Sequence, residues 1–289
     1  MNFVILTDSC ANLPDESIRR YDIRILSLSF LDNGKEYKSF ENGKTLDVTE
    51  FYEHMREGAA ITTSCVNIAE AEEAVEAILQ EGRDILYLGF SSALSATYQN
   101  VSTAINNLRE KYPERKMIAV DTLAAALGQG LLVALAARLG DEGKSIEEVA
   151  RYVEDNKLHL SHLFTVDSLK YLHRGGRVST ASAIVGTILD IKPVMHVDNE
   201  GRLVPLGKVR GVKAAVKDIL KRLDETIWPD ANNPVYIVHA DCYDRAKFIA
   251  NYVRAKYGTQ DIVIQPVDLV IGAHSGPGTL AVFFLADHR

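Results

Sequence analysis

Short runs of apolar and β-branched residues alternate with longer amphipathic stretches through the first half of this chain, and this alternation constrains the fold most strongly. The runs and stretches are Phe3–Leu6, Ile68–Glu81, Ile85–Leu88, Ser95–Lys111, Met117–Val120 and Ala124–Leu139. Strands that alternate with helices are typical of βαβ crossovers, which make neighbouring strands parallel. We therefore predict an α/β fold whose N-terminal part is a mostly parallel sheet with flanking helices.

A tight hairpin is predicted near the start of the chain. Ile25–Leu31 and Glu36–Phe40 flank an Asn33-Gly34 pair, which supplies the positive φ angles of a two-residue turn. We expect these two segments to form an antiparallel addition to the parallel sheet.

The second half predicts an α+β unit. Strand-like Val194–Val197 and Leu203–Leu206 flank the turn signal Asp198–Gly201, and a helical stretch, Val212–Ile227, ends before Pro229. Further strands are expected at Leu160–Val166, Val235–Ala240, Ile262–Val267 and Leu280–Leu285. Since 289 residues exceed what one core usually holds, we predict two domains, residues 1–157 and 158–289.

Charge and cysteine content narrow the possible partners. A net charge of −7 argues against a general nucleic-acid binder, although it does not exclude a local cationic pocket. Cys10, Cys65 and Cys242 show no metal-binding spacing, so we expect free thiols in a reducing compartment and no metal or cofactor. Without a signal peptide or a run of about 18 apolar residues, a cytoplasmic protein with at most transient membrane contact is expected.

Four turns rich in hydroxyl groups or glycine are the candidate ligand-binding segments. They are Thr7–Ser9, Thr62–Ser64, Ser91–Ser95 and His274–Thr279, each expected to follow or close a strand. Turns at strand ends that open helices present free N–H groups to an anion. As an alternative, Thr62–Ser64 could cap the helix that begins near Ile68, and Ser95 could cap the helix that follows it.

Several motifs in a fixed order carry a resemblance to a known family. They are Ile5–Ser9, Thr63-Ser64, Ser91–Tyr98, Leu169–Arg177, Ile191–Pro193, Lys208–Arg210 and His274–Thr279. The chain resembles the DegV family, the bacterial fatty-acid-binding proteins also called FakB. The resemblance implies a two-domain DegV-like (EDD) fold that holds a long-chain fatty acid and is not itself catalytic. A separate fatty acid kinase would convert that fatty acid to an acyl phosphate.

The resemblance also assigns site residues. The family's carboxylate-binding hydroxyls fall on Thr63 and Ser95. The residues expected around them are Ser64, Ser92, Arg177, Arg210 and His274. Each has a simpler alternative role: His274 could hold a turn, Arg177 could complement a helix dipole, and Arg210 could be a solvated charge.

This sequence departs from the family pattern beside those residues. The segment after Thr63-Ser64 reads Cys65-Val66-Asn67, with asparagine in place of the usual last serine. Ala93 and Ala96 replace glycines, and alanine adopts positive φ less readily than glycine. We expect these changes to affect which acyl chain is preferred.

Two other functions are open on the sequence alone. Gly89–Ala93 nearly matches a nucleophile elbow, so an acyl or ester hydrolase could use Ser91 with His274. A small carbonyl compound, the ligand type of the related dihydroxyacetone-kinase fold, is a second alternative to a lipid. Gly143-Lys144-Ser145 resembles the end of a phosphate-binding loop, but a helical stretch precedes it, so we expect no ATP binding.

Overall fold

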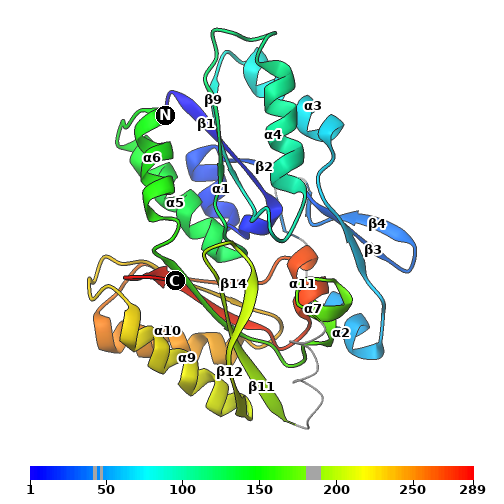
Figure 1. The fold of residues 1–289 in the computed structure, drawn as a ribbon, viewed down its shortest axis with the longest axis vertical. Coiled ribbons are helices and arrows are strands. Elements are labelled where there is room, and N and C mark those ends of the chain that lie inside the picture. Colours follow the sequence, from blue (N-terminus) through cyan, green and yellow to red (C-terminus); the bar gives the residue numbers. More distant parts are fainter. Residues whose placement is uncertain (42–43, 46–47, 180–189) are drawn as a thin grey trace.

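The computed structural model describes residues 1–41, 44–45, 48–179 and 190–289. Its first principal sheet has four parallel strands (Figure 1). In sheet order they are β2 (Arg24–Leu26), β1 (Phe3–Asp8), β8 (Asp84–Gly89) and β9 (Met117–Asp121). The predicted parallel sheet is therefore confirmed, as are its runs at β1, β8 and β9.

Helices cover both faces of this parallel sheet, as βαβ crossovers require. On one face lie α3 (Ile68–Gln80) and α4 (Thr97–Leu108), and on the other lie α5 (Leu127–Asp141) and α6 (Ile146–Asn156). Short helices η1 (Ser9–Ala11) and α1 (Asp15–Tyr21) follow β1. The triplet Gly143–Ser145 is the turn between α5 and α6, and the Ser145 side chain caps α6.

The predicted hairpin exists, but its place in the fold was predicted wrongly. Strands β3 (Ser29–Asp32) and β4 (Lys35–Lys38) pair around Asn33-Gly34, and β3 also pairs with β7 (Thr62–Ser64). This three-stranded sheet is separate from the parallel one, because the segment expected as one strand breaks at Leu28. There Ser9 Oγ accepts the Leu28 N–H, and the Leu28 carbonyl accepts the N–H of Ser39.

Three small elements lie between β4 and β7. Strands β5 (Phe40–Glu41) and β6 (Lys44–Thr45) pair with each other. Helix α2 (Thr49–Glu57) follows them and leads to β7.

The second principal sheet has six strands and is mixed. In sheet order they are β12 (Leu203–Arg210), β11 (Ile191–Val197), β10 (Leu160–Thr165), β15 (Leu280–Leu285), β13 (Val235–His239) and β14 (Ile262–Pro266). The pairs are antiparallel except β13 with β14. On one face pack α9 (Val212–Thr226) and α10 (Tyr243–Tyr257), and the described part of the chain also contains two short helices, α7 (Lys170–Arg174) and α11 (Leu269–Ser275).

Helix α5 lies between the two principal sheets (Figure 1). It contacts β1 and β8 of the first sheet and β10, β13 and β15 of the second. Glycine makes this double contact possible: a Cβ on Gly128 would overlap His162 of β10, and a Cβ on Gly130 would overlap the Ala11 carbonyl. One set of packed apolar residues accordingly includes Phe3 of β1 and Leu285 of β15, and a second set packs α9 and α10 on the six-stranded sheet. The domain boundary after residue 157 stays a prediction.

Within the described ranges, no helix is both long and apolar enough to cross a bilayer. The three cysteines are free, as the sequence predicted.

Candidate functional site

A cavity of about 290 Å³ lies between the two principal sheets, and its walls are mainly apolar. Phe90 and Leu94 contribute to it from the segment after β8, while Phe164, Val238 and Phe283 contribute from the six-stranded sheet. Both halves of the chain therefore build one cavity. Elongated apolar ligands gain affinity from such a lining in proportion to the apolar surface they bury.

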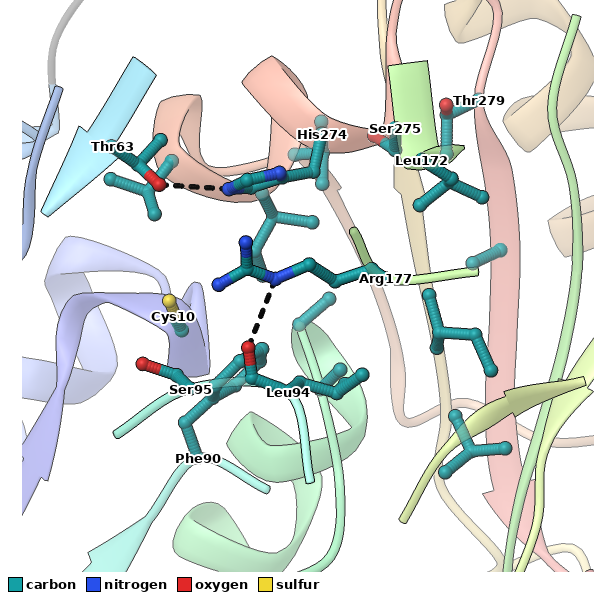
Figure 2. Close-up of a pocket in the computed structure, with 18 of the residues that line it drawn as sticks. Cys10, Thr63, Phe90, Leu94, Ser95, Leu172, Arg177, His274, Ser275 and Thr279 are labelled. Atoms are coloured by element: carbon teal, nitrogen blue, oxygen red, sulfur yellow. Dashed lines mark hydrogen bonds between the residues drawn. The ribbon is translucent and has the colours of Figure 1, made fainter. Parts of the chain in front are cut away.

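Polar side chains gather in one part of this cavity (Figure 2). Five of the seven predicted site residues line it: Thr63, Ser64, Ser95, Arg177 and His274. Thr63 Oγ1 lies 2.8 Å from Nε2 of His274, although β7 and α11 are far apart in the sequence. Packing of α11 against β7 and β3 brings the two residues together.

His274 is a neutral hydrogen-bonding group in this position. Burial, with the nearby charges of Arg177 and Arg174, lowers the pKa of His274 to about 4. If its Nε2–H donates to Thr63, the threonine hydroxyl keeps its own proton for a carboxylate. A Cβ on Gly175 would overlap Nδ1 of His274, so glycine at 175 allows the imidazole to lie there.

Ser95 is half-buried at the start of α4. Its Oγ accepts the backbone N–H of Thr97 at 3.2 Å and lies 2.9 Å from Thr97 Oγ1. The N-cap residue of α4 is Ala96, which forms no side-chain cap, so Ser95 bonds the first N–H of the helix from one position earlier, and it lines the cavity as well. Because α4 begins here, the positive end of its dipole favours an anion near Ser95.

Arg177 places a positive charge in the cavity wall. Its Nε donates to the Leu94 carbonyl at 3.0 Å, and its Nη1 donates to the Gly175 carbonyl at 2.6 Å. Burial lowers the pKa of Arg177 below its usual value. Both of these hydrogen bonds go to neutral carbonyls, and no carboxylate in the described part of the chain forms an ion pair with Arg177. An anionic ligand would supply the missing countercharge.

Two predicted site residues are not brought to the cavity. Ser92 is exposed, and its backbone N–H donates to Asp121 Oδ1 at 3.3 Å. Arg210 is exposed at the last position of β12. Neither is among the described residues that line the cavity, so any role for them at the carboxylate stays a prediction.

The candidate turns also differ from the expectation in local structure. Thr62–Ser64 is strand β7 rather than a turn, and Asn67 caps α3 in a capping box with Glu70. His274 and Ser275 form the end of α11, and the chain turns only at Gly276. At Thr7–Ser9, the buried carboxylate of Asp8 accepts the N–H groups of Cys10 and Phe90. These N–H groups are therefore already used by the Asp8 carboxylate and are not available to an anionic ligand.

Ser91 is poorly suited to the nucleophilic role considered from the sequence. It is fully buried, and its Oγ donates to the Gly201 carbonyl at 2.9 Å. It is not among the described residues of the cavity wall. The hydroxyl therefore joins the turn after β8 to the β11–β12 hairpin.

Sequence reasoning missed some residues of this site. Cys10 and Cys65 line the cavity, yet neither was a candidate because we considered cysteines only for metal and disulfide spacing. The adjacency of Cys65 to Thr63-Ser64 was the available signal for one of them.

Comparison with known proteins agrees with this architecture. The model of a family described as "Uncharacterised protein, DegV family" matches residues 2–287. A DegV domain-containing protein of Clostridium perfringens is 44% identical over 287 residues, which cover 99% of this chain and 98% of that protein.

Two solved structures show the same fold. One is a DegV family protein of Thermus thermophilus, described by its fatty acid binding, with 31% identity and a TM-score of 0.88 over 99% of this chain and 100% of that one. The other is DegV of Bacillus subtilis, described as a fatty acid binding protein, with 29% identity and a TM-score of 0.83 over 99% and 100%.

Proposed function

Because the chain belongs to the DegV family, we propose that it carries one long-chain fatty acid and presents its carboxylate to a separate kinase. The kinase would form an acyl phosphate, and the carrier would not catalyse that step itself. The mainly apolar cavity with one polar part is the observation that carries this proposal. Related proteins of the same fold are described as fatty acid binding, which supports it.

The apolar walls supply the driving force for binding. A chain of about fifteen methylenes, at roughly 0.8 kcal/mol each, would gain on the order of 12 kcal/mol on burial before ordering costs. Since Phe90, Phe164 and Phe283 line the cavity, the acyl chain would contact aromatic surface from both halves of the protein.

The polar part offsets the desolvation of the carboxylate, which costs several kcal/mol when an ion is buried without partners. We assign the hydrogen bonds to Thr63 and Ser95, with His274 holding Thr63 in place. Arg177 supplies the countercharge. Neutral His274 adds no charge, so among the described residues that line the cavity Arg177 is the cation that faces the carboxylate.

Denaturing extraction of the purified protein, followed by mass spectrometry, tests the proposal directly. We expect about one long-chain fatty acid per chain, or tight binding of added hexadecanoic acid by ligand-free protein. Recovery of no fatty acid, together with no binding of any added one, would contradict the carrier function. If the acid binds but a fatty acid kinase with ATP cannot phosphorylate it on this carrier, only the kinase partnership fails.

A further inference from the structure

Cys65 is a cavity-lining residue two positions after Thr63, which we assign to the carboxylate. It follows the last residue of β7 and lines the same cavity as Thr63 and Ser64. A ligand whose carboxyl carbon is held at Thr63 would therefore place that carbon in the region of a thiol.

The surroundings of Cys65 leave its sulfur accessible from the cavity. The side chain is only partly buried, and Asn100 Nδ2 donates to its sulfur at 3.6 Å. The guanidinium group of Arg177 lines the same cavity as Cys65 and contributes a positive charge there. Reactive cysteines occupy such electropositive, partly exposed positions.

Burial disfavours ionisation of the other two cysteines, Cys10 and Cys242. Burial raises the pKa of Cys10 well above its usual value, and it raises the pKa of Cys242 to about 11. Both thiols are therefore held in their neutral, weakly nucleophilic form. Cys10 shares the cavity with Cys65, so it serves as an internal comparison within the same protein.

A second observation indicates that the cavity takes a ligand with a polar group. Ser275 lines it and is 5% exposed, and its Oγ has no hydrogen-bond partner in the described part of the chain. A buried hydroxyl without a partner is uncommon in a folded protein, because burial without a hydrogen bond is costly. A ligand oxygen in the cavity would remove that cost.

We propose that Cys65 is a nucleophile that accepts the acyl group of an acyl phosphate held in this cavity. The proposal rests on the proposed function, since that function supplies the acyl phosphate. The sulfur attacks the carbonyl carbon, a sulfur–carbon bond forms, and the bond from that carbon to the phosphate oxygen breaks. Phosphate leaves with the electron pair and takes up the thiol proton. The products are a protein thioester and inorganic phosphate, and no oxidant or reductant is needed.

Chemically prepared hexadecanoyl phosphate tests this step on the full chain without any kinase. We expect intact-protein mass spectrometry to show one added hexadecanoyl group, which neutral hydroxylamine removes and peptide mapping places on Cys65. Cys65→Ser should lose this adduct while its unfolding midpoint shows that it still folds, and Cys242→Ser should keep it. Asn100→Ala, which retains the thiol but removes its donor together with the hydrogen bond from Asn100 to the Val66 carbonyl, should acylate about threefold to tenfold more slowly.

The outcomes separate this proposal from the carrier function. Hexadecanoic acid binding without any acylation by hexadecanoyl phosphate overturns the thioester and leaves the carrier intact. Acylation that maps to Cys10, or that persists in Cys65→Ser, also overturns it, as does an unchanged rate in Asn100→Ala. A protein that binds no hexadecanoic acid and forms no adduct contradicts both proposals.

Discussion

Thr63 Oγ1 and His274 Nε2 are 2.8 Å apart, although 211 positions separate the two residues in the chain. One residue lies on an edge strand of the small antiparallel sheet, and the other lies at the end of α11. The hydroxyl that we assign to the carboxylate is therefore oriented by a residue from the opposite half of the sequence.

Removing the two hydroxyls should weaken fatty acid binding. In a Thr63→Ala, Ser95→Ala double variant, the carboxylate loses two hydrogen bonds of about 1.5–3 kcal/mol each, the usual range for a charged group. We expect the Kd for hexadecanoic acid to rise about a hundredfold or more, measured by displacement of a fluorescent fatty acid. The methyl ester, which has no charge to anchor, is the control and should bind both proteins similarly. Equal affinity of the acid for both proteins would refute the head-group assignment.

Fatty acid binding should be nearly independent of pH around neutrality. Burial lowers the pKa of His274 to about 4, whereas an unfolded histidine titrates near 6.5. The imidazole therefore stays neutral between pH 6 and 8, and the Kd should change by less than about twofold. A Kd that changes tenfold with an inflection near pH 6.5, and loses that inflection in His274→Gln, would show that the histidine titrates normally.

The lowered pKa of His274 also predicts the direction in which the free energy of unfolding changes with pH. Between pH 4 and 6.5 the unfolded chain binds a proton at His274 that the folded chain does not. The contribution of this group to stability therefore rises with pH across that window and is constant above it. The comparison of wild type with His274→Gln in urea denaturation at several pH values isolates this contribution.

Alanine substitutions at two adjacent glycines, Gly175 and Gly176, distinguish a loss of His274 positioning from an effect of backbone strain. In Gly175→Ala the new Cβ overlaps Nδ1 of His274, so the imidazole must move and the affinity for hexadecanoic acid should fall about tenfold. Gly176 has φ +74° and open space around its Cβ position. Gly176→Ala should therefore cost about 1 kcal/mol of stability with little change in affinity. Equal affinity losses in both variants would argue against a specific role for the Gly175–His274 contact.

Regular patterning explains what the sequence predicted well. The strands β1, β8 and β9 are buried apolar runs with helices between them, so their type follows from local composition. The Asn33-Gly34 turn was equally readable, because few other dipeptides adopt two successive positive φ angles.

Long-range hydrogen bonds explain what was missed. The expected strand Ile25–Leu31 breaks at Leu28 because the Leu28 N–H donates to Ser9 Oγ and the Leu28 carbonyl accepts the N–H of Ser39. No local sequence pattern encodes those partners. The contact of Thr63 with His274 likewise depends on the packing of α11. Helix α6 was predictable, since Ser145 and Glu148 form a capping box, but we had considered that serine only as part of a phosphate-binding loop.

Ser91 provides the sharpest test between the carrier and the hydrolase. Its hydroxyl donates to the Gly201 carbonyl in a fully buried position, so Ser91→Ala leaves that carbonyl without this partner. We expect about 1–3 kcal/mol lower unfolding free energy in urea and an unchanged Kd for hexadecanoic acid. Gly201 has φ +78°, and a Cβ there would overlap Ser91 Oγ, so Gly201→Ala should destabilise the same contact from the other side. Ester hydrolysis by the wild type that disappears in Ser91→Ala would instead identify the serine as a nucleophile and reverse this interpretation.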